Sequence, residues 1–167
     1  FNPVFDDAEM NRIVADGIKA LTEMQLSDGG WGWFSGYGEH SSAHLTAQVV
    51  HGLTVAQQND VPVLPDVIQR GIEWLKNYQA SELTKLREGD KHRDNEKYKG
   101  KADYKMQADN LDAFVAMVLS EHDLNDVAMT DYLYRDRGHL SVYGLSLTGL
   151  VLHRQQDPER RDMVMRN

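Results

Sequence analysis

The chain has 167 residues, of which 41% are hydrophobic and 26% charged, and its formal net charge is −8. This acidic balance argues against nonspecific binding to nucleic acid or anionic lipid, because both need a basic surface. The complete absence of cysteine excludes disulfides, thiol catalysis and zinc–cysteine sites. No apolar run approaches the roughly 18 residues needed to cross a bilayer, so we expect no membrane contact by this chain.

Helical periodicity runs through most of the chain, and no convincing strand pattern of period two is present. The first helix is expected to follow Asp6, a candidate N-cap with Glu9 three residues later, and to continue to about Met24. Further helices are expected at about 42–57, from 65 onwards, and at 110–122, 126–135 and 140–155, with a short one in the tail. The sequence therefore predicts an all-α protein.

A densely charged segment occupies residues 82–105 and contains six acidic and eight basic residues. We interpret it as a charged surface insertion or a helical extension within a single partial domain spanning 1–167. A basic docking segment is the alternative interpretation.

The most informative pattern is a repeat of 54 residues. Residues 17–25 and 71–79 share the sequence G-I-x-x-L-x-x-x-Q, and the first copy leads into the turn D-G-G-W-G-W-F. A period in this range is typical of stacked supersecondary units. Asp28 is expected to cap the turn's own backbone, and Trp31, Trp33 and Trp74 are expected to pack between hairpins rather than line a ligand cavity. The structural motif predicted in this way comprises Gln25, Asp28, Gly29, Gly30, Trp31, Trp33, Trp74 and Gln79.

This motif resembles the QW-type repeat of α/α-toroid proteins, in which glutamine ties helix ends to neighbouring backbone. The stretch 41–50, S-S-A-H-L-T-A-Q-V-V, is similar to a helix of macroglobulin thioester domains, and 112–119 is similar to the corresponding helix one hairpin later. The pairing of D-G-G-W-G-W-F with L-T-A-x-V-V most resembles bacterial α2-macroglobulin-like proteins. The resemblance covers roughly 10–155 and is strongest over 17–79.

The resemblance implies part of a six-hairpin α/α-toroid, and 167 residues would supply an incomplete arc of about three hairpins. It also implies a structural or binding segment of a broad-spectrum protease inhibitor of the bacterial cell envelope or periplasm, which traps a protease after bait cleavage. The expected partners are other domains of a longer parent and, through that parent, target proteases. Open repeat ends would favour self-association.

We expect no catalysis and no cofactor. The thioester motif C-x-E-Q is absent, and by the resemblance it would lie upstream of Phe1. His92 falls where thioester proteins keep a histidine that directs acyl transfer, but it lacks a matching local motif and is otherwise a solvated loop residue. His40, His44 and His51 are clustered enough to consider zinc, but no third or fourth firm ligand accompanies them, so capping or surface roles are favoured.

Two other classes stay open. A fragment of a terpene-cyclase-like toroid enzyme would use aromatic residues to enclose a polyisoprenoid. The acidic D-x-D-D string of such cyclases is absent, and Asp109-x-x-Asp112 has the wrong spacing. The third possibility is a helical-repeat module that binds other proteins and has no inhibitory role.

Overall fold

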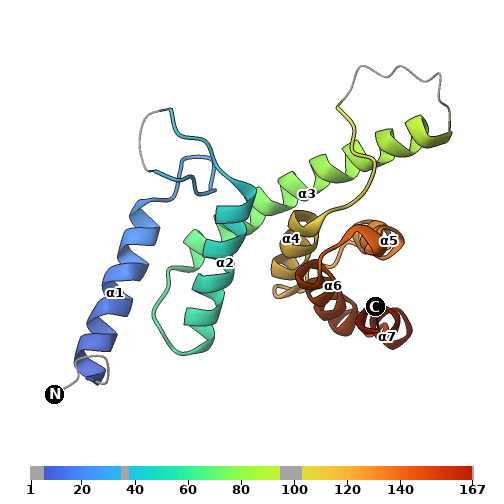
Figure 1. Cartoon of the computed structure of the whole chain (residues 1–167). Coiled ribbons are helices and arrows are strands. Elements are labelled where there is room, and N and C mark those ends of the chain that lie inside the picture. Colours follow the sequence, from blue (N-terminus) through green and yellow to red (C-terminus); the bar gives the residue numbers. More distant parts are fainter. Residues whose placement is uncertain (1–5, 35–37, 95–102, 167) are drawn as a thin grey trace. The chain divides into compact units, whose positions relative to one another are not determined.

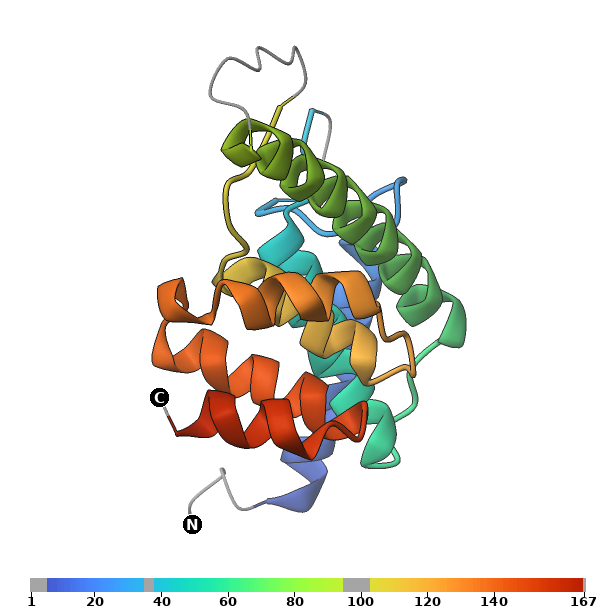
Figure 2. The same ribbon diagram turned by 90° about the vertical axis from the view of Figure 1, so that its right-hand side faces the viewer.

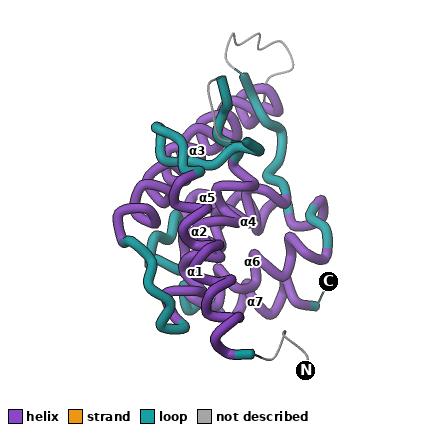
Figure 3. The backbone as a smooth tube through the Cα atoms, turned by 90° about the vertical axis from the view of Figure 1, so that its left-hand side faces the viewer, coloured by secondary structure: helices purple, strands orange, loops and turns teal. Residues whose placement is uncertain are grey.

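The computed structural model describes residues 6–34, 38–94 and 103–166, and every regular element within these ranges is a helix (Figure 1; Figure 3). The helices are α1 (Asp7–Glu23), α2 (Ala43–Gln58), α3 (Pro65–Asp94), α4 (Asn110–Ser120), α5 (Val127–Arg135), the short 3₁₀ helix η2 (Arg137–His139), α6 (Val142–Arg154) and α7 (Pro158–Met165). The predicted all-α class is confirmed, and the toroid arrangement stays a prediction. None of the described helices is long and apolar enough to cross a membrane.

Contacts divide the chain into two compact units, Phe1–Trp74 and Leu75–Asn167, with α3 contributing to both. The single domain expected over 1–167 stays a prediction.

Most helices begin at a polar side chain that accepts hydrogen bonds from the first turn. Asp6 accepts from Ala8 N and Glu9 N, as expected for the first N-cap, while the Glu9 side chain pairs with Arg12. A complete capping box starts α4, where the Asp109 and Asp112 side chains each accept from the other's backbone N–H. Ser42, Asp126, Ser141 and Asp157 cap α2, α5, α6 and α7. These local bonds explain why the helix starts could be predicted closely.

The ends of α2, α4 and α6 share one construction that the sequence reasoning missed. Each is followed by a non-glycine residue with positive φ, namely Asp60, Asp123 and Gln156. In each case a backbone N–H reaches the carbonyl five residues earlier, as in the Schellman motif: Val61 to Ala56, Leu124 to Leu119 and Asp157 to Leu152. A new helix starts within a few residues each time. This turn therefore recurs at three helix ends, separately from the glycine–glutamine pattern at 17–25 and 71–79.

In the first unit, α1 and α2 run antiparallel (Figure 1). The core consists of Trp31 with residues from α2 and the start of α3, which are Ala43, Ala47, Val50, Leu53, Val67, Ile68 and Ile72. Helix α1 contains no buried residue, and Met10, Ile13 and Val14 on it are exposed. A groove of about 640 Å³ separates α1 from the segment 59–64. Helix α1 is therefore amphipathic, and most of its apolar stripe is exposed.

In the second unit, α4 supplies the central helix, since every residue from Asp112 to Ser120 is buried. Helices α6 and α7 lie side by side, and both α4 and α5 pack against α6 (Figure 2). The remainder of α3 carries Leu75, Leu83 and Leu86 into the core. The first part of the charged segment therefore continues α3 to Asp94, with an apolar face that is buried. Residues 95–102 of that segment lie outside the described residues.

Candidate functional site

The turn after α1 is organised by the carboxylate of Asp28. Its Oδ1 accepts hydrogen bonds from Gly30 N (3.1 Å) and Ser41 Oγ (2.7 Å), and its Oδ2 accepts one from Trp74 Nε1 (2.9 Å). The predicted capping of the turn's own backbone is confirmed by the bond from Gly30. The same side chain also ties the turn to the start of α2 and to α3, so it joins three segments of the first unit.

These bonds set the ionisation of Asp28. Partial burial acts to raise its pKa, but the hydrogen bonds from Ser41, Gly30 and Trp74 outweigh it and hold the pKa below its ordinary value. The side chain is therefore a carboxylate at neutral pH, which suits a structural acceptor better than a general acid.

Trp31 is seated in a socket beside this carboxylate. Only 2% of it is exposed, its backbone N–H donates to Thr46 Oγ1 (3.0 Å), and its ring Nε1 donates to Leu21 O (2.8 Å). A Cβ at Gly71 would lie 2.8 Å from Trp31 Cζ3 and 2.5 Å from Val50 Cγ2, so only glycine leaves room for the ring. Gly29 has a backbone φ of +93°, a conformation that residues with a side chain rarely adopt. It also lies against the carbonyl of Arg70.

The three tryptophans have different environments. Trp31 is buried as expected, and Trp74 is partly buried with its ring nitrogen on Asp28. Trp33 was expected in the core, and this is wrong: it is 72% exposed, and Phe34 beside it is 74% exposed. Gly32 between the two rings is held tightly against Glu39 and the His40 carbonyl, and the chain bends at Trp33, beyond the socket that holds Trp31.

The two glutamines of the repeat are also placed differently. Gln25 Nε2 donates to Gly29 O (2.8 Å) and Val67 O (2.9 Å), so it ties the end of α1 to the turn and to α3. Gln79 lies within α3, in the second unit, and is 7% exposed. The structure therefore brings Gln25, Asp28, Gly29, Gly30, Trp31 and Trp74 together, leaves Trp33 on the surface, and places Gln79 in the other unit.

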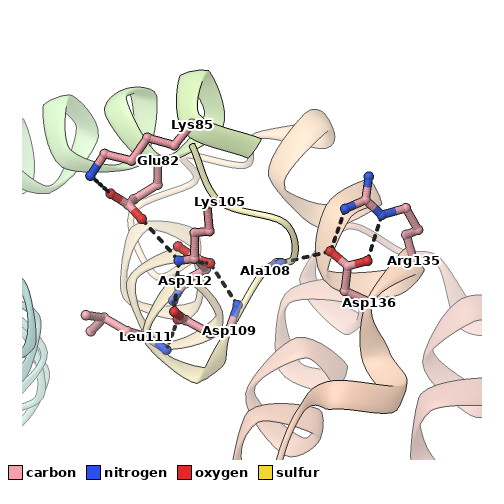
Figure 4. A network of polar contacts seen from close by, with 9 residues as sticks. All are labelled: Glu82, Lys85, Lys105, Ala108, Asp109, Leu111, Asp112, Arg135 and Asp136. Carbon is pink, nitrogen blue, oxygen red and sulfur yellow. Dashed lines mark hydrogen bonds and ion pairs between the residues drawn. The ribbon is translucent and has the colours of Figure 1, made fainter. Parts of the chain in front are cut away.

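A second polar centre, which the sequence reasoning did not find, lies in the second unit around Lys105 (Figure 4). Lys105 Nζ lies 2.6 Å from Asp112 Oδ2, 2.9 Å from Asp109 Oδ2 and 3.1 Å from Glu82 Oε2. Glu82 and Asp112 are almost fully buried. One ammonium group thus joins α3 to the start of α4.

Further bonds fix the connection that carries Lys105. Its backbone N–H donates to Lys85 O (3.0 Å), and Gly89 lies directly against its carbonyl. At the other end of the connection, Ala108 N donates to Asp136 Oδ2 (2.8 Å), and Arg135 pairs with the same carboxylate (Figure 4). The only sequence signals were Lys105 at the end of the charged segment and the pair Asp109 and Asp112, which the sequence analysis compares only with a catalytic string.

The charges of this centre influence one another strongly. Burial would lower the pKa of Lys105, but hydrogen bonds and the charges of Asp112 and Asp109 outweigh it and raise that pKa. Burial acts to raise the pKa of Glu82 and of Asp109, but their bonds to lysine hold both pKa values below the ordinary range. Burial dominates at Asp112, whose pKa is raised although Lys105 opposes the change. The cluster therefore holds its lysine charged and locked in place.

Of the histidines considered at the outset, His92 lies in a helix, where it makes a ring contact. His92 stacks on Tyr104, with ring centroids 4.0 Å apart, at the last turn of α3. This contact favours a role in holding the 103–109 connection, and a role in acyl transfer stays a prediction. Among the described residues, no group of three or more histidine, aspartate or glutamate side chains is placed to hold a metal ion.

No protein-family model matches the chain. Over 72 residues, 43% of this chain, it is 36% identical to an alpha-2-macroglobulin of Thermotoga maritima, and this region is 5% of that protein's length. Native alpha-2-macroglobulin from Escherichia coli, in a crystal structure spanning domain MG7 to the C-terminus, matches 95% of the chain with a TM-score of 0.69 and 22% identity. The match covers 23% of that chain.

The trypsin-activated form of the E. coli protein matches equally well, with a TM-score of 0.70 and 22% identity over 95% of this chain and 10% of that one. At this identity the structural likeness establishes the fold, while the Thermotoga protein supplies the likeness in sequence. Our chain spans only a small part of each relative. By sequence over 72 residues and by fold over 95% of its length, the chain is therefore similar to part of bacterial alpha-2-macroglobulins.

Proposed function

We propose that the chain is a non-catalytic structural segment of a bacterial α2-macroglobulin-like protease inhibitor, in which it forms part of the wall of a helical domain. Cleavage of a bait segment elsewhere in the longer protein would rearrange the domains, and this segment would move with its neighbours to help enclose the protease. Its partners would be other domains of that protein and, through them, the trapped protease. The corresponding location is the periplasm or cell envelope.

The observation that carries this proposal is the equal match to two states of one relative. The fold of the chain resembles the native and the trypsin-activated E. coli protein to the same degree, with TM-scores of 0.69 and 0.70. A segment that keeps one fold in both states is expected to move as a body rather than to refold. The two polar centres around Asp28 and Lys105 would serve this role, because each fixes a connection between helices.

The test uses a longer protein that carries this segment, incubated with trypsin or elastase. We expect a limited cut in a bait segment, followed by co-elution of the protease with the inhibitor on size-exclusion chromatography. The trapped protease should still cleave a small chromogenic peptide but lose activity toward casein, because enclosure excludes only large substrates. Free elution of active protease after incubation with several proteases would overturn the proposal.

A further inference from the structure

Helix α1 and the first part of α3 carry matching residues but differ in burial. The repeat of 54 residues aligns one triplet of α1 with one of α3, namely Ile13, Val14 and Gly17 with Val67, Ile68 and Gly71. Val67 and Ile68 are only 3% and 5% exposed, whereas Ile13 and Val14 are 57% and 40% exposed. Because the side chains are of the same kind, the difference lies in what covers them. We call Ile13, Val14 and Gly17 together the Gly17 face of α1.

The glycine at the centre of this face indicates a close contact. Glycine inside a helix is less stable than alanine, because it loses more backbone freedom on folding. Gly71 has a clear reason to be glycine, since Trp31 and Val50 lie so near that a Cβ would collide with them. A Cβ built at Gly17 meets no heavy atom within 4 Å among the described residues outside its own helix. The described part of the chain therefore does not supply the neighbour for which Gly17 leaves room.

The second copy of the repeat shows which kind of partner fits such a face. There, a hairpin formed by α1, its turn and α2 covers the first part of α3 with the ring of Trp31 and the side chain of Val50. Repeats of this kind pack each unit against its neighbours, and an uncovered terminal unit leaves apolar surface exposed. A second copy of this chain fits less well, because its Trp31 and Val50 already lie against Gly71.

We propose that the Gly17 face binds one further helical hairpin, contributed by another segment of the longer polypeptide. This hairpin places an aromatic ring from its turn, and a branched apolar side chain from its second helix, against Gly17. Ile13 and Val14 are then buried, as their counterparts in α3 are. The inference rests on the proposed function only in requiring a longer protein, and it holds whether or not that protein inhibits proteases.

The test compares the isolated chain with a longer protein that carries it, by hydrogen exchange of the α1 amides read by mass spectrometry. We expect exchange to be about tenfold slower in the longer protein, because the Gly17 face is then packed. Gly17→Leu should abolish this protection, since the added side chain takes the place of the ring. Lys19→Leu adds the same side chain to the opposite side of α1, where Lys19 is 74% exposed, and should leave the protection unchanged.

The isolated chain supplies the second arm of the test. In it, Gly17→Leu should slow exchange of the α1 amides, because leucine favours a helix and meets no neighbour. Faster exchange there would overturn the proposal by showing that Gly17 already has a neighbour.

Three further outcomes would also overturn the proposal. The first is equal exchange of α1 in the isolated chain and in the longer protein, and the second is protection that Gly17→Leu leaves intact. The third is protection that rises with the concentration of the isolated chain, since a second copy would then be the occupant. None of these measurements uses a protease, so their failure is distinct from a failure of protease trapping.

Discussion

The two copies of the repeat have the same pattern of residues but end in different structures. In the first copy, α1 stops at Glu23, and Gln25 lies beyond the helix and bonds to the following turn. In the second copy, Gln79 lies inside α3, which continues to Asp94. The difference follows from the next residues, S-D-G-G in the first copy and S-E-L-T in the second. Gly29 adopts φ +93° and turns the chain, whereas Leu83 in the equivalent place continues the helix.

In both copies a carboxylate nevertheless joins the repeat helix to the connection that follows, but the groups that bind this carboxylate differ. Asp28 and Glu82 both lie three residues after the repeat glutamine, and each binds a side chain from the connection that follows. Asp28 accepts from Ser41 and from a tryptophan ring, while Glu82 pairs with Lys85 and Lys105. In the first copy a carboxylate is held by neutral donors near the surface. In the second it belongs to a buried ionic cluster, so the two joints should respond differently to mutation and to pH.

Replacing the buried tryptophan should have the largest effect. Trp31→Ala removes a ring that fills the core and bonds to Leu21 O, and we expect the free energy of unfolding to fall by about 3–5 kcal/mol. Trp33→Ala, two residues away but exposed, should change it by less than ~0.5 kcal/mol. Urea unfolding followed by far-UV circular dichroism measures both. Equal losses in the two variants would contradict the socket described for Trp31.

The second largest effect is expected for the ionic cluster around Lys105 in the second copy. Lys105→Met leaves Asp112 buried without its cation and Glu82 with Lys85 alone, and we expect a loss of about 2–3 kcal/mol, moderated because Asp112 can bind a proton. Lys91→Met, which breaks an exposed pair with Glu88, is the control and should cost under ~1 kcal/mol. Hydrogen exchange of the α4 amides should quicken only in the first variant. Unchanged exchange there would show that Lys105 does not hold the connection.

The contrast between the two copies also explains which features could be predicted from the sequence. Helix positions follow from local signals such as the Asp6 cap and the spacing of apolar residues, and these were placed within a few residues. The capping of its own turn by Asp28 was predicted because Gly30 is two residues away, whereas its bonds to Ser41 and Trp74 were not. The cluster at Lys105 was not, because Glu82 and Lys105 are 23 residues apart and meet only through tertiary packing.

The helix ends at Asp60, Asp123 and Gln156, where the backbone is in the left-handed region, show a second limit of prediction from sequence. Glycine is the usual marker of such a helix end, and none of the three positions has it. A weaker signal was present, since apolar Val61 and Leu124 directly follow two of them, as the hydrophobic contact of the Schellman motif requires. The exposure of Trp33 could likewise not be predicted from the sequence pattern, because a tryptophan beside glycines is equally compatible with the core and the surface.

The glycines that open the two copies should give opposite results. Gly71→Ala places a Cβ against Val50 and Trp31, and we expect a loss of about 1–3 kcal/mol from overpacking. Gly17→Ala meets nothing within 4 Å and should raise the free energy of unfolding by about 0.5–1 kcal/mol, because alanine favours a helix. Both effects can be read from thermal melts of the single variants. The same sign in both would mean that the repeat positions are packed alike, contrary to the structure.

The smallest expected effect is the pH dependence of the stability that Asp28 contributes in the first copy. The folded-state pKa of Asp28 is lowered, so its contribution is fully present above the ordinary carboxyl pKa and is lost as pH falls through the lowered value. Asp28→Asn should therefore destabilise the chain by about 1 kcal/mol at pH 6 and by much less at pH 3. The raised pKa of Asp112 works in the opposite direction, since protonation relieves an unfavourable buried charge. Urea unfolding at the two pH values decides the matter: a cost of Asp28→Asn that is the same at pH 3 and pH 6 would mean that hydrogen bonds to the charged form do not stabilise this turn.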